Sequence, residues 1–282
     1  MQDLRQSPQY GEYMKKIGWE VEKADDCQIF IKKIPLICSF IKIQRPEKIP
    51  FLKIEKIAKK YRAFCVKIEP QNAKDAKLNA KSAKELQKHE YKEDKSPYAP
   101  PKTLQIGLTL SEKQILAQMK KDARYSIRKA QENQLRLIKI PLETFHQAWK
   151  KFNYRRLWIP SLKWLQALKD SFKNDFFQLT AKNAKSEPIL AGMILLKHDK
   201  IMYYYYAFSS KEGQKLFAPY LLVWEGIKLA KEQGCQIFDF EGIEDPRYKS
   251  TKSWRGFTHF KKSFGGKEVD YPGSFRKYRL PL

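Results

Sequence analysis

The sequence predicts an α/β protein built of two related units, each with a mixed twisted sheet flanked by helices. Its 282 residues are enough for two domains of ~100–200 residues each. Of these residues 42% are hydrophobic, so a large core is available. Both halves repeat, in outline, one order of elements: strands, a hairpin, a helix and a further strand. This repeated order indicates an α+β arrangement in each half.

The first half begins with strand-forming segments. Residues 18–46 contain runs of β-branched and aromatic residues, broken by Asp-Asp and Pro, which predict three strands after a short helix over 9–17. Residues 49–62 have helical spacing, and residues 63–70 predict a buried strand. Residues 71–97 are rich in alanine and lysine and have almost no large apolar side chains. We therefore expect a solvated loop or helix there rather than core.

A strand over 103–110 is followed by a long amphipathic segment, residues 111–133, which predicts one helix. Ser111 and Gln114 make a capping box at its start. Apolar residues recur every four positions as one buried stripe, namely Ile115, Met119, Ala123 and Ile127. The adjoining face is basic, with Lys120, Lys121, Arg124 and Arg128. This face is either a solvated surface or a contact for phosphate groups.

The second half has the clearest pattern of elements. The sequence predicts helices over 143–157, 161–172 and 218–234, and strands over 176–182, 189–197, 200–208 and 235–243. The two middle strands are joined by a tight His-Asp-Lys turn and should form a hairpin. Pro219 near the start and Gly234 near the end mark the two ends of the last helix.

This order of strands, central hairpin and following helix is typical of N-acetyltransferase-like domains. Such enzymes hold the pyrophosphate of acetyl-CoA on backbone N–H groups at the start of that helix, in a Gln/Arg-x-x-Gly-x-Gly/Ala loop. The corresponding segment here is SSKEGQKLFAP, residues 209–219, where Gly213 has no partner glycine. We expect the second domain to keep the architecture and to use no cofactor.

The charge of the chain indicates a polyanionic partner. Fifty-six Lys and Arg residues against 31 Asp and Glu residues give a net charge of +25, which favours binding to nucleic acid, phosphates or an anionic membrane surface. Residues 247–267 contain bases and no acid, and the segment GFTHFKKSFGG, residues 256–266, combines two lysines with aromatic rings. The alternative interpretation of this segment is a final strand whose phenylalanines fill the core.

Other classes of site find little support. No apolar run approaches the ~18 residues of a membrane span, so we expect a cytoplasmic protein. The four cysteines show neither metal-ligand spacing nor a disulfide pattern, which predicts reduced packing residues and no metal site. The four histidines stand in unrelated contexts, so a Ser-His-Asp set is not indicated.

Several motifs between residues 200 and 270 resemble those of the Fem-type peptidyltransferases, the family of FemX, FemA and FemB. These motifs are Tyr-x-Tyr, small-Ser-Ser, a helix that contains proline, Asp-Phe-x-Gly-Ile, and Phe-Lys-x-x-Phe-Gly. RYSIRKA in the basic helix and IKIQRP near the start also resemble family segments. The likeness thus covers most of the chain.

The resemblance implies two tandem N-acetyltransferase-like (GNAT-like) domains. We expect the first over residues 1–135, with 71–97 as a polar insertion and the tail 271–282 joined to it, and the second over 136–270. Fem-type enzymes move an amino acid from aminoacyl-tRNA onto the stem-peptide amino group of a peptidoglycan precursor. A CoA-dependent N-acetyltransferase and a non-catalytic RNA-binding protein are the alternative functions.

The resemblance also implies roles for residues at the tRNA side of the site. Phe260 and Lys261 match the family's Phe-Lys pair, in which the ring packs on the tRNA acceptor end and the lysine supports the transfer. A fixed cation beside the tetrahedral oxyanion of ester aminolysis lowers the barrier, which makes Lys261 the catalytic candidate. The candidate tRNA-binding residues are Phe260, Lys262, Arg255, Arg124 and Arg128. As a general base, Asp239 and Glu241 are candidates, although a carboxylate at a strand end more often holds a loop.

For the second substrate, the family uses a lysine before an early Trp, an arginine near the start of the second domain, and tyrosines in the hairpin. Lys16 fits the first position, and Arg155 and Arg156 both fit the second. Tyr204 and Tyr206 should share one face of their strand by its two-residue period, and a purely structural aromatic strand is an equal alternative. The partners implied are aminoacyl-tRNA and a UDP-linked or lipid-linked muropeptide, with transient contact to the inner-membrane surface and a monomeric protein.

The chain also departs from the better-known members of the family. The long antiparallel helical arm of some members has no counterpart, unless residues 71–97 are a remnant of it. Glu241 stands where a glycine is common. We therefore expect differences in how the tRNA body is held and in the geometry of the acceptor site.

Overall fold

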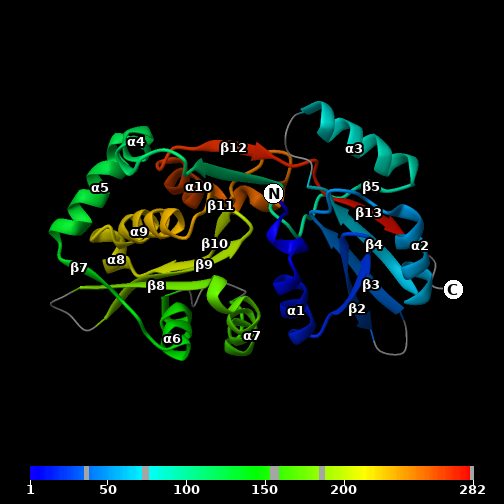
Figure 1. The fold of residues 1–282 in the computed structure, drawn as a ribbon, viewed down its shortest axis with the longest axis horizontal. Helices are drawn as coiled ribbons and strands as arrows, with labels where there is room; N and C mark the ends of the chain where they lie inside the picture. The colour runs from blue at the N-terminus through cyan, green and yellow to red at the C-terminus, as the bar shows by residue number, and fades with distance from the viewer. Residues whose placement is uncertain (35–37, 72–75, 153–158, 184–187, 280–282) are drawn as a thin grey trace. The chain divides into compact units, whose positions relative to one another are not determined.

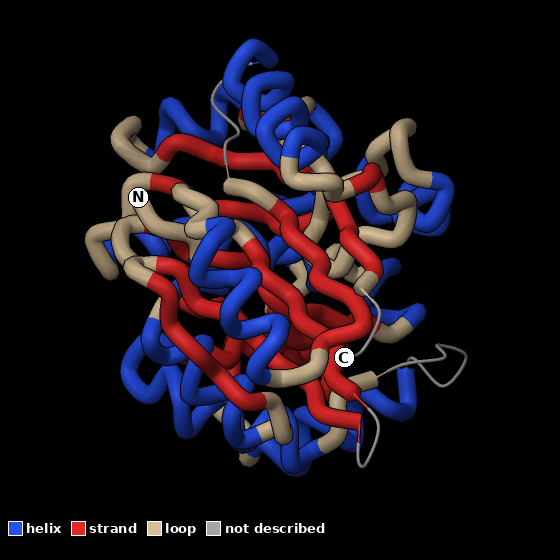
Figure 2. The backbone as a smooth tube through the Cα atoms, turned by 90° about the vertical axis from the view of Figure 1, so that its right-hand side faces the viewer, coloured by secondary structure: helices blue, strands red, loops and turns tan. Residues whose placement is uncertain are grey.

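The chain forms two compact units, each of which is a mixed sheet with helices packed against it (Figures 1 and 2). The computed structural model describes residues 1–34, 38–71, 76–152, 159–183 and 188–279. The N-terminal unit comprises residues 2–103, 242–256 and 268–282, and the C-terminal unit comprises 104–241 and 257–267. Residues 104–135, expected in the first domain, thus group with the C-terminal unit. The predicted fold class is confirmed.

The N-terminal sheet has the strand order β1-β2-β3-β4-β13-β5. Its strands are β1 (Glu20–Ala24), β2 (Cys27–Ile34), β3 (Cys38–Gln44), β4 (Ala63–Glu69), β5 (Lys92–Glu93) and β13 (Phe275–Tyr278). β3 and β4 run parallel, whereas the other neighbours run antiparallel. The three strands predicted in residues 18–46 and the buried strand after them are confirmed.

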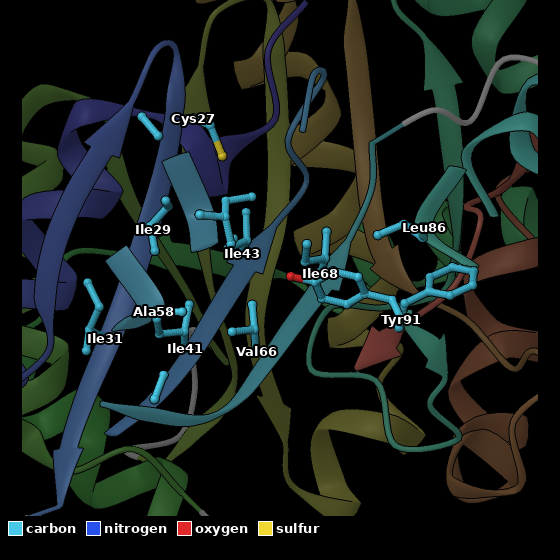
Figure 3. Close-up of a cluster of buried hydrophobic side chains, with 14 residues drawn as sticks. Cys27, Ile29, Ile31, Ile41, Ile43, Ala58, Val66, Ile68, Leu86 and Tyr91 are labelled. Carbon is cyan, nitrogen blue, oxygen red and sulfur yellow. The ribbon is translucent and has the colours of Figure 1, made fainter. Parts of the chain in front are cut away.

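The helices of the N-terminal unit are η1 (Leu4–Gln6), α1 (Pro8–Lys16), α2 (Phe51–Lys60), α3 (Ala76–Lys88) and η3 (Lys249–Trp254). Isoleucines and valine from β2, β3 and β4 form a buried cluster, which Ala58 of α2 and Leu86 of α3 complete (Figure 3). Leu86 is 0% exposed. Tyr91, just after α3, is 1% exposed and belongs to the same cluster. The expectation that residues 71–97 stay out of the core is therefore wrong at these two positions, because two large side chains are enough to anchor a polar segment.

The C-terminal sheet has the strand order β12-β6-β11-β10-β9-β8-β7. Its strands are β6 (Lys102–Gly107), β7 (Leu135–Ile138), β8 (Phe176–Asn183), β9 (Ile189–His198), β10 (Ile201–Ser209), β11 (Ile237–Gly242) and β12 (Lys267–Asp270). The predicted hairpin is present, since β9 and β10 pair antiparallel. β10 and β11 pair in parallel, as the helix between them requires.

Helices cover both faces of this sheet. They are α4 (Glu112–Gln118), α5 (Lys121–Glu132), α6 (Leu142–Phe152), α7 (Leu162–Phe172), η2 (Lys173–Asp175), α8 (Lys211–Lys215), α9 (Ala218–Glu232) and α10 (Arg255–Lys262). Gly226 of α9 packs against Met193 of β9, whereas Phe145 of α6 packs against the adjacent residue, Gly192, from the other side. Figure 1 shows α9 and α6 on opposite faces of the sheet.

The two units share one topology. In the N-terminal unit β1, β2 and β3 form an antiparallel meander, and α2 leads to β4 parallel to β3. In the C-terminal unit β8, β9 and β10 form the same meander, and α9 leads to β11 parallel to β10. The repeated order read from the sequence is therefore a repeated fold.

Residues 111–133, predicted as one helix, form two helices. The capping box starts α4 as expected, but Met119 and Lys120 have extended backbones, with ψ angles of 152° at both residues. The Lys120 N–H donates to the carbonyl of Ser263 at 2.8 Å, in the turn after α10. The guanidinium of Arg124 donates to the carbonyl of Met119. These two bonds satisfy backbone groups at the break, which therefore costs less than an unpaired helix end.

The segment GFTHFKKSFGG is a helix followed by a glycine turn, so the alternative expectation of a final strand is wrong. Gly265 and Gly266 have φ angles of 79° and 92°, in the region that glycine adopts without strain. A Cβ on Gly266 would lie 2.6 Å from the carbonyl oxygen of Gln105, and one on Gly265 would lie 2.8 Å from that of Gln118. The glycine pair thus lets the end of α10 approach two backbone segments closely.

We expect Gly266→Ala to lower the free energy of unfolding by more than about 1 kcal/mol, because the Cβ meets both a positive φ and a carbonyl oxygen. Gly256→Ala is the matched control, since Gly256 lies inside α10 with open space around it. That change should raise stability by roughly 0.5–1 kcal/mol through helix propensity. Urea unfolding of both variants checks this, and equal stability of the two would contradict the close approach.

Candidate active site

A lysine lies on the buried side of α10. Phe257, Lys261 and Phe264 follow one another at spacings of four and three residues, which places them on one side of a helical segment. Lys261 is only 7% exposed and Phe264 1%. Lysine is almost never buried without partners, because its ammonium loses hydration. Its surroundings must therefore replace that hydration.

The ammonium of Lys261 is held by a strand carbonyl and two aromatic rings. Its Nζ donates to the carbonyl oxygen of Phe240 in β11 at 2.7 Å. It lies 4.9 Å from the ring centroid of Phe257 and 5.6 Å from that of Tyr204, which are cation–π distances. These contacts fix the position of the charge at the end of β11.

Burial makes the charged form of this lysine expensive. It lowers the pKa of Lys261 to about 8, and the nearby carboxylates of Glu241 and Asp239 act in the opposite direction and raise it. At pH 7 the group is still mostly protonated. It is therefore a cation that can give up a proton close to neutral pH, a property common in catalytic groups.

The two carboxylates stand in different environments. Asp239 is buried, and it accepts one hydrogen bond from Nε2 of Gln105 at 2.7 Å and another from the N–H of Glu241 at 2.6 Å. It therefore holds the end of β11, as the structural interpretation of Asp239 predicts. Glu241 is half-buried and has a φ of 58°, a left-handed conformation that glycine adopts more readily than glutamate.

Aromatic rings enclose the lysine on the side of the sheet that faces α9. Phe240 lies 5.7 Å from Tyr204 and 5.6 Å from Phe264, measured between ring centroids. Tyr220 of α9 stacks on Phe264 at 5.5 Å. These rings keep water away from Lys261 and so strengthen its electrostatic interactions.

The other candidates on α10 stand beside the lysine. Phe260 is half-buried, with its ring 4.9 Å from Tyr220 and 5.2 Å from Phe264. Lys262 is half-buried, and Arg255 is exposed at the first position of the helix. Arg255 and Lys262 are seven residues apart, which is two helical turns, so one side of α10 is basic.

The two arginines of α5 differ in their contacts. Arg124 donates to the carbonyls of Ala117 and Met119 and so caps the end of α4. Arg128 is exposed, and its Nε lies 3.6 Å from Glu132, in a surface ion pair of the kind that contributes little to stability. Arg124 thus has a structural contact that the sequence did not indicate, whereas Arg128 keeps most of its side chain in solvent.

Tyr204 and Tyr206 do not share a face of β10, so the expectation from the two-residue period is wrong. The register against β9 shifts between them, because Tyr204 pairs with Leu195 and Tyr206 pairs with the adjacent Ile194. Tyr205 is the extra residue of this β-bulge. Tyr204 contacts Phe240 on the α9 side, and Tyr206 lies 5.0 Å from Trp149 of α6.

The candidates for the second substrate lie elsewhere in the chain. Lys16 is exposed at the end of α1 in the N-terminal unit. Arg155 and Arg156 lie outside the described residues. Trp19, the aromatic residue that marks the lysine motif, carries Lys42 on its ring at 4.5 Å. The roles of Lys16, Arg155 and Arg156 stay predictions.

Sequence reasoning missed three residues that shape the site: Phe257, Tyr220 and Gln105. Phe257 and Tyr220 carried a signal, since each occurs at helical spacing from other apolar residues. Gln105 carried none, because its bond to Asp239 joins positions 134 residues apart in sequence. Such a contact follows from strand order, which a single sequence does not contain.

The loop that would hold a coenzyme pyrophosphate is internally bonded. The N–H groups of Gly213, Gln214, Leu216 and Phe217 all donate to acceptors within residues 210–214. A Cβ on Gly213 would lie 2.2 Å from the carbonyl oxygen of Leu190, so this glycine serves the packing of α8 on β9. The segment therefore offers few donors for a phosphate cradle.

The described residues contain neither a membrane-spanning helix nor a cluster of metal ligands. None of the helices there is long and apolar enough to cross a membrane. Across the same residues, no group of three or more His, Cys, Asp and Glu side chains lies close enough to hold a metal ion. All four cysteines are free thiols.

Comparison with known proteins connects this geometry with a family. Residues 162–282 match the model of the FemAB family. No curated protein sequence matches the chain.

Solved structures share the fold at low sequence identity. A crystal structure of FemX has a TM-score of 0.82 at 16% identity, over 99% of this chain and 92% of that one. L-PGS from Bacillus licheniformis has a TM-score of 0.60 at 13% identity, over 95% and 86%. A tandem GNAT protein from the clavulanic acid biosynthesis pathway has a TM-score of 0.52 at 6% identity, over 91% and 81%.

We expect Lys261→Met to stabilise the protein at pH 7 and to do so less as the pH rises from 8 to 10. The pKa of Lys261 is about 8 in the folded chain against 10.5 for the ordinary group, so the unfolded chain binds more protons between these values. The cost of burying the charge is therefore complete below pH 8 and fades above it. It amounts to a few kcal/mol, at about 1.4 kcal/mol for each pK unit.

The measurement is the midpoint of urea unfolding at pH 7 and pH 9.5. Lys262→Met is the matched control, because Lys262 is the more exposed neighbour and its replacement should change stability little. If Lys261→Met changes the free energy of unfolding by the same amount at both pH values, the contacts of the ammonium offset its burial and its pKa is not lowered in the folded chain.

Proposed function

We propose that this chain, whose residues 162–282 match the model of the FemAB family, is a tRNA-dependent aminoacyltransferase of that family. It would move an amino acid from aminoacyl-tRNA onto the stem-peptide amino group of a peptidoglycan precursor. The observation that carries the proposal is the buried ammonium of Lys261, fixed by the carbonyl of Phe240 next to Phe260. The low identity to FemX gives the fold alone, so the activity rests on this site and on the family motifs.

The chemistry is the aminolysis of an ester. The nitrogen of the acceptor amine attacks the ester carbon, a C–N bond forms, and the C–O bond to the tRNA ribose breaks. The negative charge on the tetrahedral oxygen would be stabilised by the Lys261 ammonium, in surroundings where aromatic rings exclude water. The proton lost by the amine balances the proton gained by the leaving ribose oxygen.

The near-neutral pKa of Lys261 would also allow this residue to transfer protons during the reaction. A cation with a pKa of about 8 can pass a proton to the leaving oxygen and regain it from the attacking amine. Glu241 supports the protonated state from the end of β11, and Asp239 does the same while it anchors the backbone. In this proposal Lys261 is the catalytic residue, and Asp239 is a positioning residue.

The tRNA side of the site would be formed by α10 and α5. Phe260 offers a half-buried ring for one unpaired base of the acceptor end, and Lys262 and Arg255 offer charges for phosphates. Arg128 offers a further exposed cation, whereas Arg124 is engaged by backbone carbonyls. The precursor's phosphates would be bound by Lys16, Arg155 and Arg156. Its sugar peptide would be bound by Tyr204, which lies on the Lys261 side of β10, whereas Tyr206 lies on the opposite face and has no place in this proposal.

The alternatives are less well supported by these residues. A CoA-dependent acetyltransferase needs free backbone donors before α9, and those N–H groups are bonded within the loop. A non-catalytic RNA-binding protein has no use for a buried lysine with a lowered pKa. The proposed setting is a monomeric cytoplasmic protein with transient contact to the inner-membrane surface, where lipid-linked precursors reside.

One reconstituted assay tests the function. The protein is incubated with a mixture of charged tRNAs and a UDP-linked or lipid-linked muropeptide, and mass spectrometry identifies any added residue. Addition of one or more amino acids to the stem peptide supports the proposal and names the donor. Acetylation of the peptide in the presence of acetyl-CoA alone would instead establish the acetyltransferase alternative.

We expect Lys261→Ala to slow single-turnover transfer by roughly 100-fold or more at saturating substrates, because one oxyanion donor commonly contributes ~10²–10³-fold. The parent rate should fall as the pH rises through about 8, where Lys261 loses its proton. That falling limb should be absent from the residual rate of the variant.

Lys262→Ala is the matched control for this prediction. It removes the adjacent, more exposed ammonium and should weaken tRNA binding by a salt-sensitive amount without changing the rate at saturation. If Lys261→Ala transfers as fast as the parent, the lysine has no catalytic function.

We expect Lys16→Ala to raise the KM for the muropeptide and to leave the KM for charged tRNA nearly unchanged, since only the precursor's phosphates would contact Lys16. Lys15→Ala is the control, because Lys15 pairs with Glu12 at 2.7 Å on the same helix and has no assigned ligand. Steady-state kinetics with each substrate varied in turn checks this. Equal losses for both substrates would place Lys16 outside the precursor site.

A further inference from the structure

A row of aromatic rings leads from the surface of the C-terminal unit to the candidate active site. Tyr125 of α5 lies 6.1 Å from Phe217, which lies 6.4 Å from Tyr220, which in turn lies 4.9 Å from Phe260, all between ring centroids. Phe260 is the residue before Lys261 on α10. Three separate segments of the chain thus contribute to one continuous row.

The rings of this row contact one another edge to face. The angles between successive ring planes are 83°, 67° and 77°. In an edge-to-face contact each ring covers only a small part of its neighbour's face. The row therefore differs from a stack of parallel rings, because its members are not stacked on one another, although one face of Tyr220 is covered by the stacked ring of Phe264.

The exposure of the rings decreases toward the lysine. Tyr125 is 46% exposed, and Phe217, Tyr220 and Phe260 are half-buried, whereas Phe264 beyond them is 1% exposed. A row that served only the core would be buried along its whole length. This row begins in solvent and ends beside Lys261, as the path of a ligand would.

The ring in the middle of the row is held by an unusual backbone. Phe217 has φ 61° and ψ 23°, the left-handed conformation, at the N-cap of α9. This conformation is unfavourable for a bulky residue, and glycine or asparagine would adopt it more readily. The carbonyl of the preceding Leu216 accepts a hydrogen bond from Nδ2 of Asn133 at 3.4 Å. Strain of this kind is typical of functional positions.

Cations flank the outer end of the row. The guanidinium of Arg128 lies 5.7 Å from the ring of Tyr125, and Nζ of Lys129 lies 5.9 Å from it. Both cations also pair with Glu132, so their charge is only partly offset by one carboxylate. Basic groups beside a series of aromatic faces are the combination that proteins use to bind single-stranded nucleic acid.

We propose that Tyr125, Phe217 and Tyr220 form a stacking track that guides the unpaired 3′ end of an RNA to Phe260 and Lys261. The proposal rests on the proposed function, because an aminoacyl ester is carried by that end. Each ring would take a base face, and Arg128 and Lys129 would contact the phosphates at the entrance. An anionic membrane would reach only the exposed Tyr125, which makes it the less suitable partner for a row that descends into the unit.

The test compares two RNA hairpins that share one stem and differ in a short unpaired 3′ tail. We expect the parent protein to bind the tailed hairpin more tightly than the blunt one. Tyr125→Leu and Tyr220→Leu should each weaken binding of the tailed RNA roughly 5- to 100-fold, as for one lost base stack, and leave the blunt RNA unchanged. Tyr125→Phe keeps the ring and should keep the affinity.

Two controls separate this result from a loss of structure. Tyr278→Leu removes a 63% exposed tyrosine of the N-terminal unit and should have no effect on either RNA. Fluorescence of 2-aminopurine in the 3′ tail should be quenched by the parent protein and less by Tyr125→Leu, because quenching reports stacking directly. Thermal unfolding of each variant shows whether it is folded.

Three outcomes would overturn the track. The first is an unchanged preference for the tailed RNA in both leucine variants. The second is a loss of binding to anionic phosphatidylglycerol vesicles in Tyr125→Leu with RNA binding intact, which would assign the residue to a membrane surface. If either of these outcomes is found and the parent protein still transfers an aminoacyl group, the stacking track is refuted but the proposed function stands. The third is a parent that shows neither tail preference nor transfer, in which case the proposed function fails as well.

Discussion

The burial of one ammonium group organises the C-terminal unit around the end of β11. A lysine in this position needs a fixed acceptor, and the carbonyl of Phe240 provides it. The next residue, Glu241, has a left-handed backbone, and its N–H donates to the Asp239 carboxylate. The Lys261 ammonium, the turn at Glu241 and the Asp239 carboxylate are thus linked through three consecutive residues of β11.

The position of α10 depends on contacts at its far end. The turn after it approaches Gln118 and Gln105 so closely that only glycine fits at Gly265 and Gly266. The same turn accepts a hydrogen bond from Lys120 at the break between α4 and α5. An interruption in one helix thus fixes the end of another, which explains why a regular amphipathic pattern is broken at that point.

Much of the fold follows from local pattern in the sequence. The meander, the hairpin and the helix between parallel strands could be predicted, because alternating and helical spacings are strong in those segments. The break after Gln118 could not, since the apolar stripe continues through Met119 and Ala123 without a signal. The burial of Lys261 was also hidden, because a lysine in an amphipathic helix is ordinarily expected in solvent. The role proposed for Lys261 was indicated by its resemblance to a family motif and not by its spacing.

The bulge in β10 has a consequence for how this strand corresponds to strands of other proteins. Four consecutive tyrosines, Tyr203 to Tyr206, give no sign of which one is the additional residue, yet the pairing with β9 shows it to be Tyr205. A relative whose strand lacks the bulge would have no residue between the positions equivalent to Tyr204 and Tyr206. An alignment without a gap at Tyr205 would therefore match the residues on one side of the bulge correctly and displace those on the other side by one position. Equivalent residues of this strand are those whose side chains lie on the same side of the sheet. An ungapped alignment would instead pair residues that lie on opposite sides.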